Sequence, residues 1–106
     1  MERVVYVNEE FLPESKACVS FRDRGFVLGD AVFDAERTFD GSIFRLEAHI
    51  SRLFNSLDKA KINPGLSQSK MIEITHEVLE KNRDLLRPGE DYWIMQRVTR
   101  GLNIVG

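Results

Sequence analysis

The 106-residue sequence has little of several features that would decide its class at once. The single cysteine, Cys18, excludes an internal disulfide and fits a reducing compartment, so we expect a cytoplasmic protein in which Cys18 is a small buried residue. No apolar run approaches the roughly 20 residues of a membrane-spanning helix, and no membrane partner is expected. A net charge of -2 lacks the clustered basic excess of nucleic-acid-binding proteins, which excludes nucleic acid as an expected partner.

Glycine and metal-ligand motifs are sparse as well. The glycines occur singly, so no glycine-rich phosphate loop of the Walker or dinucleotide type is present. His49 has no second ligand at a useful spacing, and no metal site is expected. Internal repeats, low-complexity tracts and linkers are also missing. A chain of this length has room for one domain with a modest core, which buries roughly 60–65% of its unfolded surface.

The stretch from Phe33 to Leu57 organises the rest of the chain. Alternating residues flank Asp40-Gly41, and this pair favours a two-residue hairpin because both central positions of a type I′ turn need a positive φ. After Arg45 the period changes to that of one helix face, with apolar residues at Leu46, Ile50, Leu53, Phe54 and Leu57. The stretch therefore predicts a strand, a short returning strand and a helix.

The flanking segments predict further elements. We expect strands over 3–7, 17–21 and 91–99, a hairpin turn at 8–10, a charged turn over 22–25, and helices over 46–62 and 67–82. Asn63-Pro64-Gly65 ends the first helix because proline cannot continue it, and Ser67 is a favoured N-cap for the second. Strands and helices are segregated along the chain. The predicted fold is therefore α+β, a mainly antiparallel sheet with two consecutive helices packed on one face.

Two arginines depart from this pattern. Alternation in the central strand places Arg37 on an apolar face with Phe33 and Ala35. A guanidinium cannot lose its charge, so Arg37 needs an anionic partner, either a carboxylate of the protein at the domain edge or a ligand. Arg52 lies beside the apolar seam of the first helix, and periodicity alone describes it as a solvated arginine.

Several short motifs occur in the order and spacing of a known family. They are Asp23-Arg24-Gly25-Phe26, Leu28-Gly29-Asp30-Ala31-Val32-Phe33, Phe44-Arg45-Leu46, His49-Ile50-Ser51-Arg52-Leu53 and Val98-Thr99-Arg100-Gly101. Together they resemble the N-terminal small domain of class IV pyridoxal-phosphate aminotransferases. That family includes branched-chain and D-amino-acid aminotransferases, R-selective amine transaminases and aminodeoxychorismate lyases. The similarity covers nearly the whole chain.

The resemblance implies roles for individual residues. Arg52 matches the arginine of the family's His-x-x-Arg-Leu motif, which binds the cofactor phosphate, and a planar fork of donors suits that group. The positions of Phe33, Ala35 and Arg37 line the substrate side of the cofactor in that family. Arg37 therefore has a ligand-facing interpretation beside its pairing within the protein.

Two departures concern the branch of the family. Leu28 and Met95 stand where branched-chain aminotransferases usually carry a tyrosine and an arginine for the substrate carboxylate. Both are therefore expected at the substrate site, while their types argue against a branched-chain assignment. The ending Thr99-Arg100-Gly101-Leu102 is closer to the D-amino-acid and R-amine branches. The branch stays open.

The resemblance also implies a function and partners. Residues 1–106 would be the small domain of a two-domain enzyme that uses pyridoxal phosphate to transfer an amino group from an amino acid or primary amine to a 2-oxo acid. The lysine that bonds the cofactor lies in the family's C-terminal domain, and none of Lys16, Lys59, Lys61, Lys70 or Lys81 matches its motif. We therefore expect a longer natural chain whose C-terminal domain completes the site, a homodimer, and no catalysis by these residues alone.

Two alternatives remain open from the sequence. A non-catalytic dimerisation or small-anion-binding module could use the same fold and cover the outer face of its sheet by self-association. An aminodeoxychorismate lyase would use the same scaffold and the same motifs.

Overall fold

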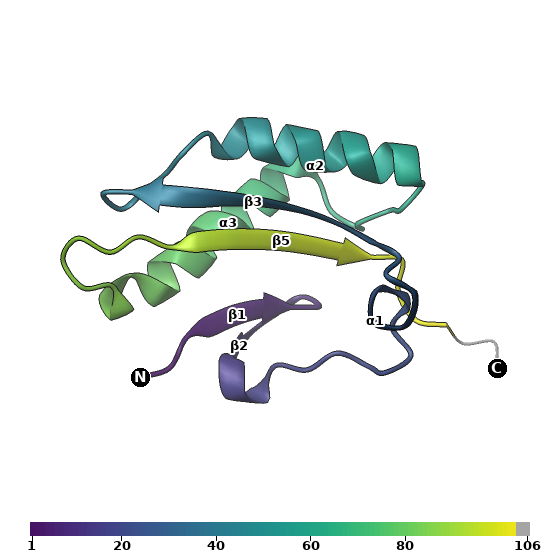
Figure 1. The fold of residues 1–106 in the computed structure, drawn as a ribbon, viewed down its shortest axis with the longest axis horizontal. Helices are drawn as coiled ribbons and strands as arrows, with labels where there is room; N and C mark the ends of the chain where they lie inside the picture. Colours follow the sequence, from purple (N-terminus) through teal and green to yellow (C-terminus); the bar gives the residue numbers. More distant parts are fainter. Residues whose placement is uncertain (104–106) are drawn as a thin grey trace.

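The computed structural model describes residues 1–103 (Figure 1). In chain order the elements are β1 (Val4–Val7), β2 (Glu10–Pro13), the 3₁₀ helix η1 (Glu14–Lys16), α1 (Arg24–Leu28), β3 (Ala31–Phe39), β4 (Ser42–Ile43), α2 (Leu46–Ala60), α3 (Gln68–Asn82), the 3₁₀ helix η2 (Arg83–Leu85) and β5 (Trp93–Thr99). The central sheet has the order β4-β3-β5 with antiparallel pairs, and β1 and β2 form a separate antiparallel hairpin. The predicted α+β fold is confirmed.

The two long helices build the core against the central sheet. α2 runs along β3, and α3 passes behind the sheet (Figure 1). The core residues are Leu46, Ile50, Leu53 and Leu57 of α2 together with Ile62 and Met71. Ile50 and Leu53 are fully buried, as the helical spacing predicts. Neither these helices nor any other helix within residues 1–103 has the length and apolar character needed to cross a bilayer.

Local chemistry explains the turns and helix ends. Asn8 and Glu9 have φ values of 46° and 75°, and Asp40 and Gly41 have 50° and 84°, so both hairpins close through two consecutive residues with positive φ. Ser67 caps α3 by accepting a hydrogen bond from the Lys70 N–H at 3.1 Å, as predicted. α2 ends at Ala60, two residues before the predicted end. Its final turn closes there because the left-handed Lys61 donates its N–H to the Asp58 and Leu57 carbonyls.

In β3 the polar face is buried and the apolar face is exposed, the reverse of what is usual for a strand that packs on a core. Three polar side chains lie buried beneath the helices: Asp34, Glu36 and Thr38. The apolar face is the exposed one, with exposed fractions of 55% for Phe33 and 70% for Trp93 on the adjacent β5. Arg37 does lie on the apolar face, as alternation predicts, but within the chain that face is not the core. A polar face can be buried here because α2 and β5 supply hydrogen-bond partners for its groups.

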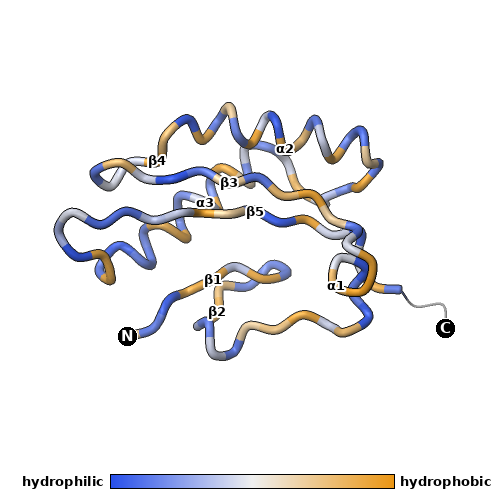
Figure 2. Tube along the Cα trace, viewed as in Figure 1, coloured by the Kyte–Doolittle hydropathy of each residue, from blue (hydrophilic) through white to orange (hydrophobic). Residues whose placement is uncertain are grey.

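Two local predictions before β3 are wrong. Residues 17–21 form no strand, and Cys18 is exposed. The charged turn that follows opens the short helix α1, because the Asp23 side chain accepts a hydrogen bond from the Gly25 N–H at 2.8 Å and Gly29 ends the helix with a φ of 66°. α1 carries three exposed apolar residues, Phe26, Val27 and Leu28, and the trace is orange at this helix in Figure 2.

Candidate functional site

Asp34 is the centre of a polar cluster between β3 and α2. Its Oδ2 accepts a hydrogen bond from Arg52 Nε at 2.7 Å, and its Oδ1 accepts one from Arg52 Nη2 at 2.8 Å. Oδ1 also accepts hydrogen bonds from the Ala35 N–H and from His49 Nδ1, both at 2.9 Å. His49 and Arg52 are three residues apart on α2, so they lie on one side of the helix and reach the same carboxylate. The bidentate pair fixes the plane of the guanidinium.

The cluster sets the charge of its members. The hydrogen bond from Arg52 is the main reason that the pKa of Asp34 is lowered to about 2, although burial acts in the opposite direction. The carboxylate in turn raises the pKa of Arg52. An ionised carboxylate can only accept hydrogen bonds, so the proton of the His49–Asp34 bond belongs to His49 Nδ1. The 3.4 Å approach of Arg52 Nη2 to that nitrogen is therefore a contact between two donors.

Arg52 combines a fixed orientation with accessibility. Its side chain is 67% exposed, whereas that of Asp34 is 5% exposed. Arg52 uses Nε and Nη2 for Asp34, and within residues 1–103 no group bonds its Nη1. From Ala31 to Arg37, β3 pairs with β5 on one edge, while its other edge pairs with β4 only at Thr38 and Phe39.

The backbone pattern places the Arg52 fork at this open edge of β3. The Thr38 N–H points to β5, where it donates to the Tyr92 carbonyl, and backbone groups of neighbouring residues in a strand point to opposite edges. The Ala35 N–H therefore points to the open edge, and Asp34 bonds it there. Periodicity alone described Arg52 as a solvated arginine, and the structure adds its attachment to β3.

The Asp34 cluster predicts a loss of stability in acid. An acid whose pKa is lower in the folded state contributes stability above its unfolded pKa of 3.8, and this is lost as the pH falls towards 2. We expect about 2 kcal/mol or less of unfolding free energy to disappear over that window, because solvent screens the exposed Arg52 partner. Denaturant unfolding at a series of pH values should show this step in the wild type and lose it in Asp34→Asn. An identical acid transition in the variant would count against the cluster.

The β3–β5 register gathers predicted substrate residues on the exposed face. Ala35 lies opposite Met95, and Arg37 lies opposite Trp93. Four residues predicted to contact substrate therefore share one surface, and they are Phe33, Ala35, Arg37 and Met95. Leu28 is separate from them, because it lies on α1 at the end of the sheet where β3 begins, and it is 69% exposed.

Arg37 finds an anionic partner within the chain. Its Nη2 donates to Asp91 Oδ2 at 3.0 Å, its Nε donates to the Thr38 carbonyl at 3.1 Å, and its guanidinium lies 4.0 Å from the centre of the Phe39 ring. Of the two partners considered for Arg37 from the sequence, a protein carboxylate or a ligand, the structure shows the carboxylate. The side chain remains 53% exposed and lines an open hollow of about 320 Å³ together with Gly89, Asp91, Tyr92 and Trp93.

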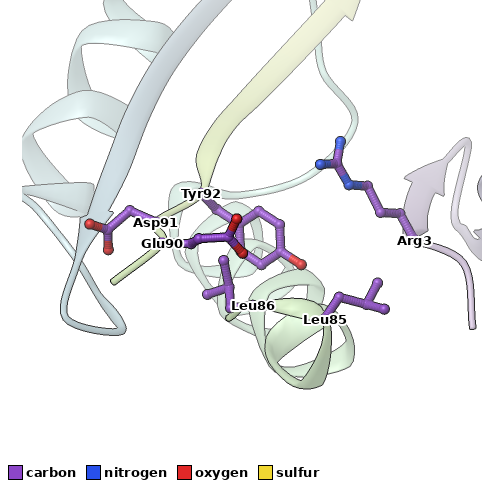
Figure 3. Close-up of a pocket in the computed structure, with 6 residues that line it drawn as sticks. All are labelled: Arg3, Leu85, Leu86, Glu90, Asp91 and Tyr92. Carbon is purple, nitrogen blue, oxygen red and sulfur yellow. The ribbon is translucent and has the colours of Figure 1, made fainter. Parts of the chain in front are cut away.

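A second hollow lies beside the first and is not part of the candidate site (Figure 3). It measures about 290 Å³ and is lined by Arg3, Leu85, Leu86, Glu90, Asp91 and Tyr92. Two of its polar groups are already engaged, since the Tyr92 hydroxyl donates to the Asn82 carbonyl at 2.6 Å and Glu90 accepts from the Arg87 N–H at 2.8 Å. No residue of the predicted cofactor or substrate site lines it.

The arginine of the Thr99-Arg100-Gly101 motif makes contacts that stabilise the fold. Arg100 Nε donates to Asp30 Oδ2 at 2.6 Å, and its two terminal nitrogens donate to the Lys61 and Ala60 carbonyls at 3.0 and 2.9 Å. Arg100 therefore ties the end of β5 to the C-terminus of α2, where carbonyl groups need donors. The five lysines of the chain are all exposed, so none of them has the desolvated surroundings of a lysine that bonds a cofactor.

Sequence reasoning missed the importance of Asp34 and Glu36. It gave neither residue a role, and it considered His49 as a possible metal ligand. A usable signal was present. Two acids spaced two residues apart on one strand face are followed by a helix that carries a histidine and an arginine three residues apart.

Comparison with known proteins decides the family. The family model for amino-transferase class IV matches residues 31–103, a range that includes Asp34, His49 and Arg52. The putative branched-chain-amino-acid aminotransferase of Methanocaldococcus jannaschii is 38% identical over 102 residues. The chain belongs to the class IV aminotransferases.

This class IV chain spans about a third of the length of the relatives it matches. The match to the Methanocaldococcus protein covers 96% of this chain and 34% of that protein. The D-alanine aminotransferase of Staphylococcus haemolyticus is 32% identical over 78 residues, which are 74% of this chain and 28% of that enzyme. The chain therefore corresponds to the small N-terminal domain of full-length aminotransferases. These relatives favour an aminotransferase domain over a non-catalytic module.

The fold is shared with solved aminotransferases. The branched-chain aminotransferase of the thermophilic archaeon Thermoproteus uzoniensis, crystallised with norvaline, superposes with a TM-score of 0.82. The superposition covers 99% of this chain and 36% of that one, at 19% sequence identity. At that identity the likeness concerns the fold.

Proposed function

We propose that this chain is the small domain of a pyridoxal-phosphate-dependent aminotransferase and that Arg52 binds the phosphate of the cofactor. The observation that supports this proposal most strongly is the geometry of Arg52. Asp34 fixes the plane of its guanidinium, although the side chain is 67% exposed. Its Nη1 is not used by any group within residues 1–103 and is available to a ligand. A rigid, charged fork of donors suits phosphate oxygens. The residues present thus fit the phosphate end of the cofactor.

Asp34 would act by ordering Arg52 before the ligand arrives. A long side chain that must be immobilised on binding costs affinity, and an arginine already held in one orientation avoids most of that cost. The ion pair neutralises part of the positive charge, but a phosphate dianion can still accept bonds from the outward donors. Asp34 is therefore proposed as a positioning residue and Arg52 as the binding residue.

The exposed face of β3 and β5 would form one wall of the substrate site. Phe33, Ala35 and Met95 offer apolar contacts, while Arg37 offers a half-exposed cation already oriented by Asp91. Leu28 would border this wall from α1. We propose an amino acid or a primary amine as the donor and a 2-oxo acid as the acceptor, as in the family that the sequence resembles.

The remaining parts of the enzyme would come from outside these residues. Bound pyridoxal phosphate supplies the electron sink for amino transfer. Because every lysine of the chain is exposed, the lysine that bonds the cofactor would come from a C-terminal domain of the full-length protein. The same domain or a second subunit would cover the apolar face with Phe33 and Trp93, since an uncovered patch of this kind promotes association. A homodimer is proposed on that basis.

A comparison of two proteins tests this function. The protein at its full natural length should bind pyridoxal phosphate stoichiometrically and transfer amino groups to a 2-oxo acid. The 106-residue chain alone should give no saturable, stoichiometric absorbance change with pyridoxal phosphate, because hydrated lysines form only nonspecific adducts. A saturable band from the short chain would contradict the expected origin of the lysine. Failure of the full-length protein to bind the cofactor would contradict the function itself.

A further inference from the structure

Glu36 is a buried acid that the proposed function does not use. Its side chain is on the same face of β3 as Asp34, two residues further along, and the residue is 3% exposed. One oxygen of Asp34, one oxygen of Glu36 and one ring nitrogen of His49 all lie within 4.8 Å of one another. Glu36 is therefore a close neighbour of Asp34, the carboxylate that binds Arg52.

The surroundings of Glu36 give little stabilisation to a negative charge. Gln96 Nε2 donates one hydrogen bond to Glu36 Oε1 and lies 3.1 Å from Thr75 Oγ1, whose own proton goes to the Met71 carbonyl at 2.8 Å. Glu36 Oε2 and Gln96 Oε1 are both buried without a hydrogen-bond partner among residues 1–103. A carboxylate with a single neutral donor in such a place is costly, and a neutral carboxylic acid costs less because no charge is buried.

The charged groups that face Glu36 come from two elements. Asp34 faces it from β3, and its negative charge opposes ionisation; His49 faces it from α2. The bonds of Arg52 go to Asp34 and not to Glu36. From α3 and β5 the neighbours are the neutral Thr75 and Gln96. Burial raises the pKa of Glu36, with the Gln96 hydrogen bond as a partial offset.

We propose that Glu36 is a positioning residue for the Arg52 anion site, and that it works as an uncharged carboxylic acid whose deprotonation weakens phosphate binding. This rests on the proposed role of Arg52. While Glu36 is neutral, Asp34 is the single negative charge that orients the guanidinium. An ionised Glu36 would place a second negative charge within 4.8 Å of Asp34 and His49, compete for the His49 proton and lower the positive potential at the outward face of Arg52.

Equilibrium binding of pyridoxamine 5′-phosphate, which forms no bond to a lysine, tests the proposal in the protein at full natural length. Dissociation constants are measured from about pH 6 to about pH 9 for the wild type and for Glu36→Gln, which is neutral and nearly the same shape. The ratio of wild-type to variant constants cancels the titration of the phosphate itself. We expect this ratio to rise roughly ten-fold with pH, because one buried charge is present in the wild type alone. A constant ratio would overturn the proposal.

Infrared spectroscopy keeps the proposal testable if Glu36→Gln does not fold. Wild-type protein should show the carbonyl stretch of a neutral carboxylic acid near neutral pH, and this band should fade as the pH rises. A spectrum without such a band near neutral pH would overturn the proposal. Arg52→Ala separates the two ideas. If it binds the ligand like wild type, the phosphate role of Arg52 fails, whereas a loss of affinity together with a constant Glu36→Gln ratio rejects the role of Glu36 alone.

Discussion

Replacing Arg52 with alanine should weaken the binding of pyridoxal phosphate to the full-length protein by about ten-fold or more. The variant removes charge-assisted donors whose orientation Asp34 sets in advance, at 2.7 and 2.8 Å. It should keep the fold while losing the stability that the Asp34 pair contributes, because the Arg52 side chain is 67% exposed and fills no part of the core. Fluorescence or absorbance titration of the apoprotein with the cofactor measures the effect.

Two further variants separate the guanidinium from charge in general. Arg52→Lys keeps the charge but loses the planar fork, so its affinity should fall between those of the wild type and Arg52→Ala. Arg83→Ala is the matched control, since Arg83 also pairs with a carboxylate, that of Glu80 at 2.6 Å, and lies at the end of α3. Its affinity should equal that of the wild type. Equal losses in Arg52→Ala and Arg83→Ala would point to a general electrostatic effect and reject the specific site.

Replacing Leu53 with alanine should lower the free energy of unfolding of the 106-residue chain by about 3–4 kcal/mol. Leu53 is fully buried on the face of α2 that packs against β3, with Ile50 and Leu57 beside it. The change removes the transfer free energy of the deleted carbons and leaves a cavity that a well-packed core closes only in part. Denaturant unfolding followed by circular dichroism measures it.

Phe33→Ala is the control that tests the inverted strand. Phe33 is larger than Leu53 but is 55% exposed on the outer face of β3, so its loss should cost less than about 1 kcal/mol in the same chain. A cost for Phe33→Ala equal to that for Leu53→Ala would mean that the apolar face of β3 is buried in solution. In the full-length protein the same residue should matter more, because a second domain or subunit is proposed to cover that face.

Local features of the fold were predictable from neighbouring residues. Asp40-Gly41 produced the expected hairpin, Ser67 the expected cap, and the spacing of Leu46, Ile50 and Leu53 the expected helix face. Each depends on side chains within a few turns of each other, so the information lies in a short window of sequence. The class IV motifs were recognisable for the same reason, and the family follows from them.

Which face of β3 is the core was not predictable from alternation. A period of two separates Phe33 and Arg37 from Asp34 and Glu36, but it does not say which set the helices will cover. The usual preference for apolar cores pointed to the wrong face within this chain. The polar face can be the buried one because its acids find hydrogen-bond partners elsewhere in the sequence. Arg52 and His49 of α2 donate to Asp34, and Gln96 of β5 donates to Glu36.

The sequence by itself determined most elements of this domain, its family and the arginine expected to bind phosphate, because these depend on short-range spacing and short motifs. The tertiary structure alone decided that Asp34 orients that arginine and that Glu36 is buried behind it. Those contacts join residues of β3 to residues 15 to 60 positions away. Pairing over such separations depends on how helices dock onto a sheet, and a local pattern does not carry that information.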